Sequence, residues 1–232
     1  MRELVPADDT RAADWLVTSL RGFAESIPSL VPVGFATYVR VFHPAYLRGK
    51  PVRWADIALA NGKDAHVGMQ LDVLTGSADS YNIPPQLDVF DWVPQEGSLP
   101  LKLVESLLPV LARHTSTPQR CWFGAWEGWG ALRRDLALAP KFGIPGRSYH
   151  LLAGPIEAAT ESVSQVAVGP ELPFLSALAF QSTSFWWPDD HAWCVATEID
   201  FNTTYIGCDE VCCHEILRLG LESFEVDPAA RG

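Results

Sequence analysis

Acidic and aromatic side chains crowd the stretch from residue 185 to residue 200, which holds the strongest candidates for chemistry. It reads FWWPDDHAWCVATEID and contains three tryptophans, three aspartates, one glutamate and one histidine. If a strand begins near Trp193, its two-residue period places Glu198 and Asp200 on one face. Neighbouring carboxylates can differ in pKa and so divide the roles of acid and base. The spacing therefore predicts an acidic pair at one end of a strand, with Asp189 as a third acid nearby.

Glu198 needs a cationic partner in such a strand, because burying an unpaired carboxylate is costly. Arg40 is the candidate, since it is the charged residue of a second apolar strand predicted over residues 35–42. Two interpretations stay open. Glu198 and Arg40 form an ordinary ion pair at a sheet edge, or Glu198 serves as a general base or a ligand-binding carboxylate.

Two aspartates and a histidine, Asp189, Asp190 and His191, directly follow Pro188. Aspartate and histidine bind metal ions, so the cluster is compatible with a metal site. Aspartate after proline is also typical of a turn, because its side chain bonds the local backbone. The composition favours the turn over the metal site.

The five cysteines predict reduced thiols, because their number is odd and a cytoplasmic location is expected. Cys208, Cys212 and His214 are residue types that bind zinc, and a zinc-stabilised fold is one reading of them. The usual Cys-x2-Cys pairs are missing, however. The pattern favours a helix that packs small cysteines against the sheet. We therefore expect no bound metal and no cofactor, and no nucleophile motif such as Gly-x-Ser-x-Gly occurs.

The tryptophans cluster in two parts of the chain, at residues 122–129 and 186–193. Most should lie in the core, because large aromatic side chains dominate buried area. Those predicted in loops are expected to line a groove or an interface, where tryptophan is enriched. Together with the charged candidates they give the predicted ligand- or partner-binding residues: Arg40, Trp126, Glu127, Trp186, Trp187, Asp189, Glu198 and Asp200.

The elements that must position these residues predict an α+β fold. Apolar spacing and strand composition predict the following elements: helices at 10–23, 52–60, 101–114 and 209–219, and strands at 35–42, 147–152, 193–200 and 201–207. Residues 120–130 are predicted to form a further strand that runs into a glycine-rich turn. Strict strand–helix alternation is absent, so we expect a mixed or mainly antiparallel sheet with helices packed on one face. A single domain over residues 1–232 is expected, with a long irregular segment at about 76–100.

Composition and charge narrow the class of protein. With 48% hydrophobic residues and 19% charged residues, the chain is expected to be globular. The formal net charge of -11 argues against a nucleic-acid surface, which needs clustered lysine and arginine. We also expect no membrane span, because no apolar run approaches about 20 residues. The first residues lack the pattern of a signal peptide, which predicts a cytoplasmic protein.

Several motifs together resemble a family of uncharacterised bacterial proteins. They are WWPDD-x-AWCVATEID over residues 186–200, TY-x-G at 204–207, RCWF at 120–123, VFHPA at 41–45 and RWA at 53–55. The resemblance covers nearly the whole chain and implies a single domain. It implies no activity and no catalytic residues. Size and element order are also similar to those of bacterial toxin-immunity proteins, by analogy alone.

These observations give two hypotheses for the function. The first is a non-catalytic binding protein for a partner protein or a small ligand, in an immunity-type or regulatory role. The alternative is a hydrolase-like enzyme that uses a carboxylate cluster of Glu198, Asp200 and Asp189, with or without a metal. A cleft that holds the three carboxylates together would favour the enzyme.

Overall fold

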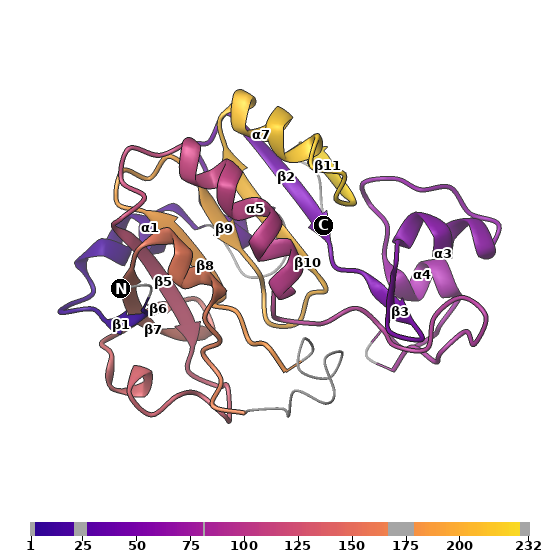
Figure 1. Cartoon of the computed structure of the whole chain (residues 1–232), viewed down its shortest axis with the longest axis horizontal. Coiled ribbons are helices and arrows are strands. Elements are labelled where there is room, and N and C mark those ends of the chain that lie inside the picture. Colours follow the sequence, from indigo (N-terminus) through magenta and orange to yellow (C-terminus); the bar gives the residue numbers. More distant parts are fainter. Residues whose placement is uncertain (1–2, 21–26, 81, 167–178, 228–232) are drawn as a thin grey trace.

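An antiparallel sheet forms the centre of the computed structural model, which describes residues 3–20, 27–80, 82–166 and 179–227 (Figure 1). Its strands run in the order β1-β7-β5-β8-β9-β10-β2-β11, and β6 also pairs with β7. Each of these pairs is antiparallel, which confirms the predicted α+β fold with a mainly antiparallel sheet. The strands are β1 (Val5–Pro6), β2 (Thr37–Phe42), β5 (Cys121–Trp126), β6 (Lys141–Ile144), β7 (Arg147–Gly154), β8 (Phe185–Pro188), β9 (Cys194–Ala196), β10 (Thr203–Cys208) and β11 (Ser223–Val226).

Two helices, α5 (Leu101–Arg113) and α7 (Glu210–Leu217), lie side by side over one face of this sheet (Figure 1). The predicted stripe of α5, including Leu103, Leu107 and Leu111, is buried in the same cluster as Val195 and Ile206 of the sheet. Helix α7 begins where its sequence predicts, because the Asp209 carboxylate accepts a hydrogen bond from the third N–H of the helix. None of the helices in the described ranges is long and apolar enough to cross a membrane.

The opposite face of the sheet is covered by the N-terminal segment, which includes α1 (Asp14–Ser19) and α2 (Ile27–Leu30). Leu16 of α1 is fully buried in a cluster with Tyr149, Trp187 and Tyr205. The two longest described helices thus share one face, as predicted, and short helices add a cover to the other. The second cover is needed because strands such as β8 carry apolar side chains to both faces.

A side lobe, residues 45–94, projects from the end of β2 (Figure 1). It has its own apolar cluster, in which Phe90 and Met69 are buried with Phe42 of the sheet. Its described residues from 76 onward form isolated bridges but no helix or strand. The elements of the lobe are β3 (Ala45–Leu47), β4 (Lys50–Val52), α3 (Trp54–Ala60) and α4 (Leu71–Thr75).

A buried glutamate fixes the lobe to the sheet. The Glu222 carboxylate, just before β11, accepts hydrogen bonds from the backbone N–H groups of Trp54 (2.6 Å) and Ala55 (2.7 Å). These are first-turn donors of α3, which have no partner within the helix. The Trp54 indole N–H donates to the carbonyl of His43 at 2.7 Å. Burial raises the pKa of Glu222, while the two backbone N–H groups lower it.

Replacing Glu222 by Ala should therefore destabilise the docked lobe. Two buried N–H groups would lose their acceptor, at a cost of about 1–3 kcal/mol each. We expect a lower urea midpoint and faster proteolysis within residues 45–94. Glu210→Ala, at an exposed position of α7, is the matched control and should change little. Equal midpoints for the two variants would contradict this role of Glu222.

Candidate functional site

The tryptophan pair of the 185–200 stretch belongs to the core. Trp186 and Trp187 are exposed by only 1% and 0%. They lie in the clusters on opposite faces of the sheet, so neither can contact a partner from a surface loop. The prediction of a tryptophan groove was wrong at these two positions. The physical reason is that β8 is a central strand with two covered faces, in which every side chain is buried.

The acidic pair lies beyond its strand. β9 ends at Ala196, and Glu198 and Asp200 occupy the turn that leads to β10. Their cation is Arg147, whose guanidinium lies 3.0 Å from the Glu198 carboxylate and 2.7 Å from that of Asp200. The predicted pairing of Glu198 with Arg40 was therefore wrong. β7 and β9 are separated in the sheet by β5 and β8, and the long side chain of Arg147, the first residue of β7, reaches the carboxylates that follow β9.

Trp126, at the end of β5, contacts Arg147 beside this acidic turn. The Arg147 guanidinium lies over its ring, 5.9 Å from the centroid. The adjacent Glu127 accepts a hydrogen bond from Lys141 at 2.8 Å and is half exposed. The structure thus brings three predicted site residues, Trp126, Glu198 and Asp200, to one end of the sheet.

Asp189 lies at the other end. The predicted turn after Pro188 is present, with a hydrogen bond from the His191 N–H to the Pro188 carbonyl. The Asp189 carboxylate accepts from the Trp122 indole at 2.9 Å. Because β8 and β9 are antiparallel, residues that follow Pro188 and residues that follow Ala196 lie at opposite ends of the pair. The predicted three-acid cluster with Glu198 is therefore not formed.

The cysteines pack in the core, as the favoured interpretation predicted. Cys208 and Cys212 are buried and reduced, whereas His214 is exposed on the outer side of α7. In the described ranges, no group of three or more histidine, cysteine, aspartate or glutamate side chains is placed to hold a metal ion. The zinc interpretation therefore has no geometric support here.

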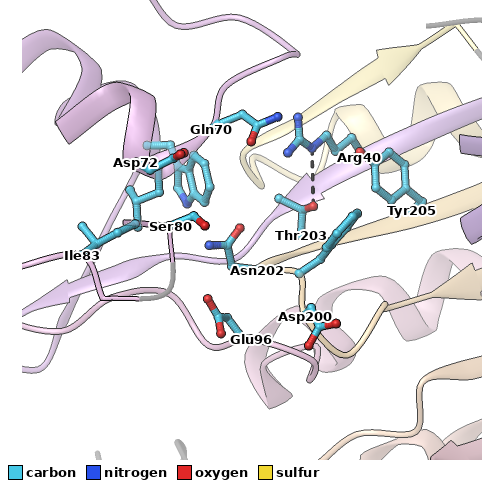
Figure 2. Close-up of a pocket in the computed structure, with 13 residues that line it drawn as sticks. Arg40, Gln70, Asp72, Ser80, Ile83, Glu96, Asp200, Asn202, Thr203 and Tyr205 are labelled. Atoms are coloured by element: carbon cyan, nitrogen blue, oxygen red, sulfur yellow. Dashed lines mark hydrogen bonds between the residues drawn. The ribbon is translucent and has the colours of Figure 1, made fainter. Parts of the chain in front are cut away.

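Arg40 lines a pocket of about 190 Å³ between the sheet and the side lobe (Figure 2). Its Nη1 donates to the Val67 carbonyl at 2.8 Å, and its Nε lies 3.5 Å from the Thr203 hydroxyl. The guanidinium also lies over the Phe42 ring, 4.5 Å from the centroid. It forms no salt bridge with a carboxylate of the described residues. Burial lowers the pKa of Arg40, and nearby Tyr205 opposes this shift.

Polar groups from several segments surround the same space. Figure 2 shows the amide of Gln70 beside the Arg40 guanidinium and the amide of Asn202 farther away, between Arg40 and the carboxylate of Glu96. The apolar walls include Trp54, Ile83 and Phe201. Much of Glu96 is exposed at the mouth of the pocket. Partial burial raises the pKa of its carboxyl, and the negative charge of Asp200 adds to this shift.

Sequence reasoning missed Gln70, Glu96, Asn202 and Thr203. A signal existed for two of them: Asn202 and Thr203 directly follow the turn that contains Asp200. Glu96 lies in the irregular segment, and long irregular segments are often functional. No comparable signal marks Gln70, because its position depends on how the lobe folds back onto the sheet.

The Arg147 pairing predicts the effect of a substitution. Arg147 and Glu198 are 17% and 13% exposed, so Arg147→Gln would leave a mostly buried carboxylate without its cation. We expect a loss of about 3 kcal/mol in the free energy of unfolding. Lys141→Gln removes the same charge from a pair exposed by 48% and 41%, and should cost less than about 1 kcal/mol. Urea unfolding measures both, and equal losses would refute the distinction.

Comparisons with known proteins do not identify the site. Comparison with protein-family models, with curated protein sequences and with solved structures gave no match. The resemblance to a family of uncharacterised bacterial proteins therefore stays a prediction, and the function is argued from the pocket beside Arg40.

Proposed function

We propose that this protein binds a small anionic ligand in the pocket beside Arg40 without transforming it. One observation carries the proposal: the Arg40 side chain is partly buried in the pocket wall yet has no carboxylate partner among the described residues. Buried charges in proteins are normally paired, because desolvation is otherwise uncompensated. The anionic group of a ligand would supply the missing charge.

The chemistry of the pocket wall supports an oxyanion. Arginine presents a planar fork of donors that matches a carboxylate or a phosphate. Nη2 of Arg40 donates to no described residue, so this part of the fork is open to a ligand. The Gln70 and Asn202 amides can add hydrogen bonds. A volume of about 190 Å³ suits a small metabolite.

A regulatory or immunity-type role in the cytoplasm belongs to this proposal. The pocket has one wall on the sheet and one on the side lobe, so a bound ligand would contact both. A ligand that binds across two such parts favours their docked arrangement. The lobe also carries exposed apolar side chains, including Leu59, Leu87 and Trp92. A partner protein that binds these side chains would distinguish the docked lobe from an undocked one.

Arg40→Met tests the proposal. In differential scanning fluorimetry and calorimetric titration, acetate and inorganic phosphate should each be tried against both proteins. We expect at least one of them to stabilise and bind the wild type, and we expect Arg40→Met to lose that response. Arg218→Met removes the same charge at an exposed position and should behave as the wild type does. If neither anion binds the wild type, or if binding survives in Arg40→Met, the proposal is wrong.

The same variant has an expected effect on stability. Methionine keeps most of the apolar stem but removes a charge that no described carboxylate compensates. Without ligand, Arg40→Met should therefore be as stable as the wild type, or more stable by roughly 1 kcal/mol. A large loss of stability would instead mark Arg40 as a structural residue.

A hydrolase is the second candidate, and the neighbouring carboxylates of Glu96 and Asp200 favour it. Burial and the charge of Asp200 raise the pKa of Glu96, as in carboxylate pairs that divide acid and base roles. Asp200 was predicted for this role and lines the pocket; Glu96 replaces Asp189 and Glu198, which do not line it.

The hydrolase candidate predicts turnover of at least one p-nitrophenyl ester, phosphate or glycoside. Glu96→Gln should abolish that turnover, because glutamine cannot donate the proton. In the wild type, activity should fall as pH rises through the raised pKa of Glu96, since the general acid is then ionised. Hydrolysis that is equal in the wild type and in Glu96→Gln would eliminate this candidate.

A further inference from the structure

A basic group and two acidic groups lie toward different ends of the pocket, and a third carboxylate, Asp72 of α4, lines its lobe side. Arg40, Gln70 and Thr203 lie at one end, and Glu96 and Asp200 lie toward the other, with Asn202 between them in Figure 2. Arg40 and Glu96 do not pair with each other, and neither forms a salt bridge with another described residue. Two opposite charges thus face one small cavity without neutralising each other directly.

From this arrangement we infer that the ligand is zwitterionic: a small amino acid whose carboxylate binds Arg40 and whose ammonium group binds Glu96 and Asp200. The inference rests on the proposed function and names the ligand class for the same pocket. A ligand with only an anionic group would satisfy Arg40 but leave two carboxylates close together at the mouth. An ammonium group placed between these carboxylates would reduce their mutual repulsion.

The positions of the two acids suit a cationic group. Asp200 is held by Arg147 at 2.7 Å, which fixes its carboxylate in the turn, and half of its side chain stays exposed. Glu96 and Asp200 line the same pocket, and the negative charge of Asp200 contributes to the raised pKa of Glu96, so a cation bound between them would interact with both carboxylates. A primary ammonium has three donors and can bond both of them.

The charge of the whole chain favours the same class. A formal net charge of -11 repels a simple anion on its way to the pocket. A zwitterion carries no net charge, so its approach avoids that repulsion. The apolar walls at Trp54 and Phe201 suit the methylene groups that separate the two charges of such a ligand.

Calorimetric titration with matched pairs of probes tests the inference. The amino acids are β-alanine, γ-aminobutyrate and 5-aminovalerate, and the controls are propionate, butyrate and valerate, which lack the amino group. For at least one chain length, we expect the amino acid to bind 10-fold or more tightly than its matched carboxylate. Glu96→Gln should reduce that advantage below 3-fold and leave carboxylate binding no weaker. Glu105→Gln, on the exposed side of α5, should leave every affinity unchanged.

The outcomes separate the inference from the function on which it rests. If carboxylates bind in an Arg40-dependent way but amino groups add nothing at any chain length, the zwitterion is wrong and anion binding stands. If an amino-acid advantage survives in Glu96→Gln, the acidic end is wrongly assigned. If no probe binds the wild type, both the function and the ligand class are refuted.

Discussion

The structure depends on the burial of both faces of its central strands. In β8, successive tryptophans point to opposite sides, and each is buried in a different cluster. A strand of this kind cannot lie at the surface, so one layer of helices must cover each face. Helices α5 and α7 supply one cover, and the N-terminal segment supplies the other. The acidic turn with Glu198 and Asp200 lies beyond the end of β9, whereas Arg40 lies within β2 and faces the pocket beside the side lobe.

Three buried or partly buried charged side chains differ in the groups that compensate their charge. The Glu222 carboxylate is satisfied by backbone N–H groups, and Glu198 by the guanidinium of Arg147. Arg40 has a carbonyl, a hydroxyl and aromatic rings around it, but no opposite charge among the described residues. The first two arrangements are complete without a ligand. The third is the one that a ligand would complete, and for that reason it carries the proposed function.

The sequence predicted the features that depend on residues close together in the chain. The apolar stripe of α5, the Asp209 cap of α7 and the turn after Pro188 are all present, because each depends on residues within a few positions of one another. The pairing of Glu198 with Arg147 spans 51 positions, and nothing in the sequence distinguishes Arg147 from Arg40 as the partner. The pocket could not be predicted either, because its walls come from segments far apart in the sequence and meet only when the lobe docks on the sheet. No strand was predicted at β8, because its four residues end in proline and show no alternation of polar and apolar types.

The cap that Glu222 places on α3 has a consequence for how the chain folds as it is made. The acceptor and the donors are up to 168 positions apart, so α3 is complete in sequence long before its cap exists. Contacts of such long range form late, because the loop between them must close first. On the ribosome N-terminal parts emerge first, so the lobe cannot dock beside Arg40 until the segment around β11 has been synthesised. A nascent chain truncated before residue 222 should therefore lack a closed pocket, even though it already contains every side chain that lines it.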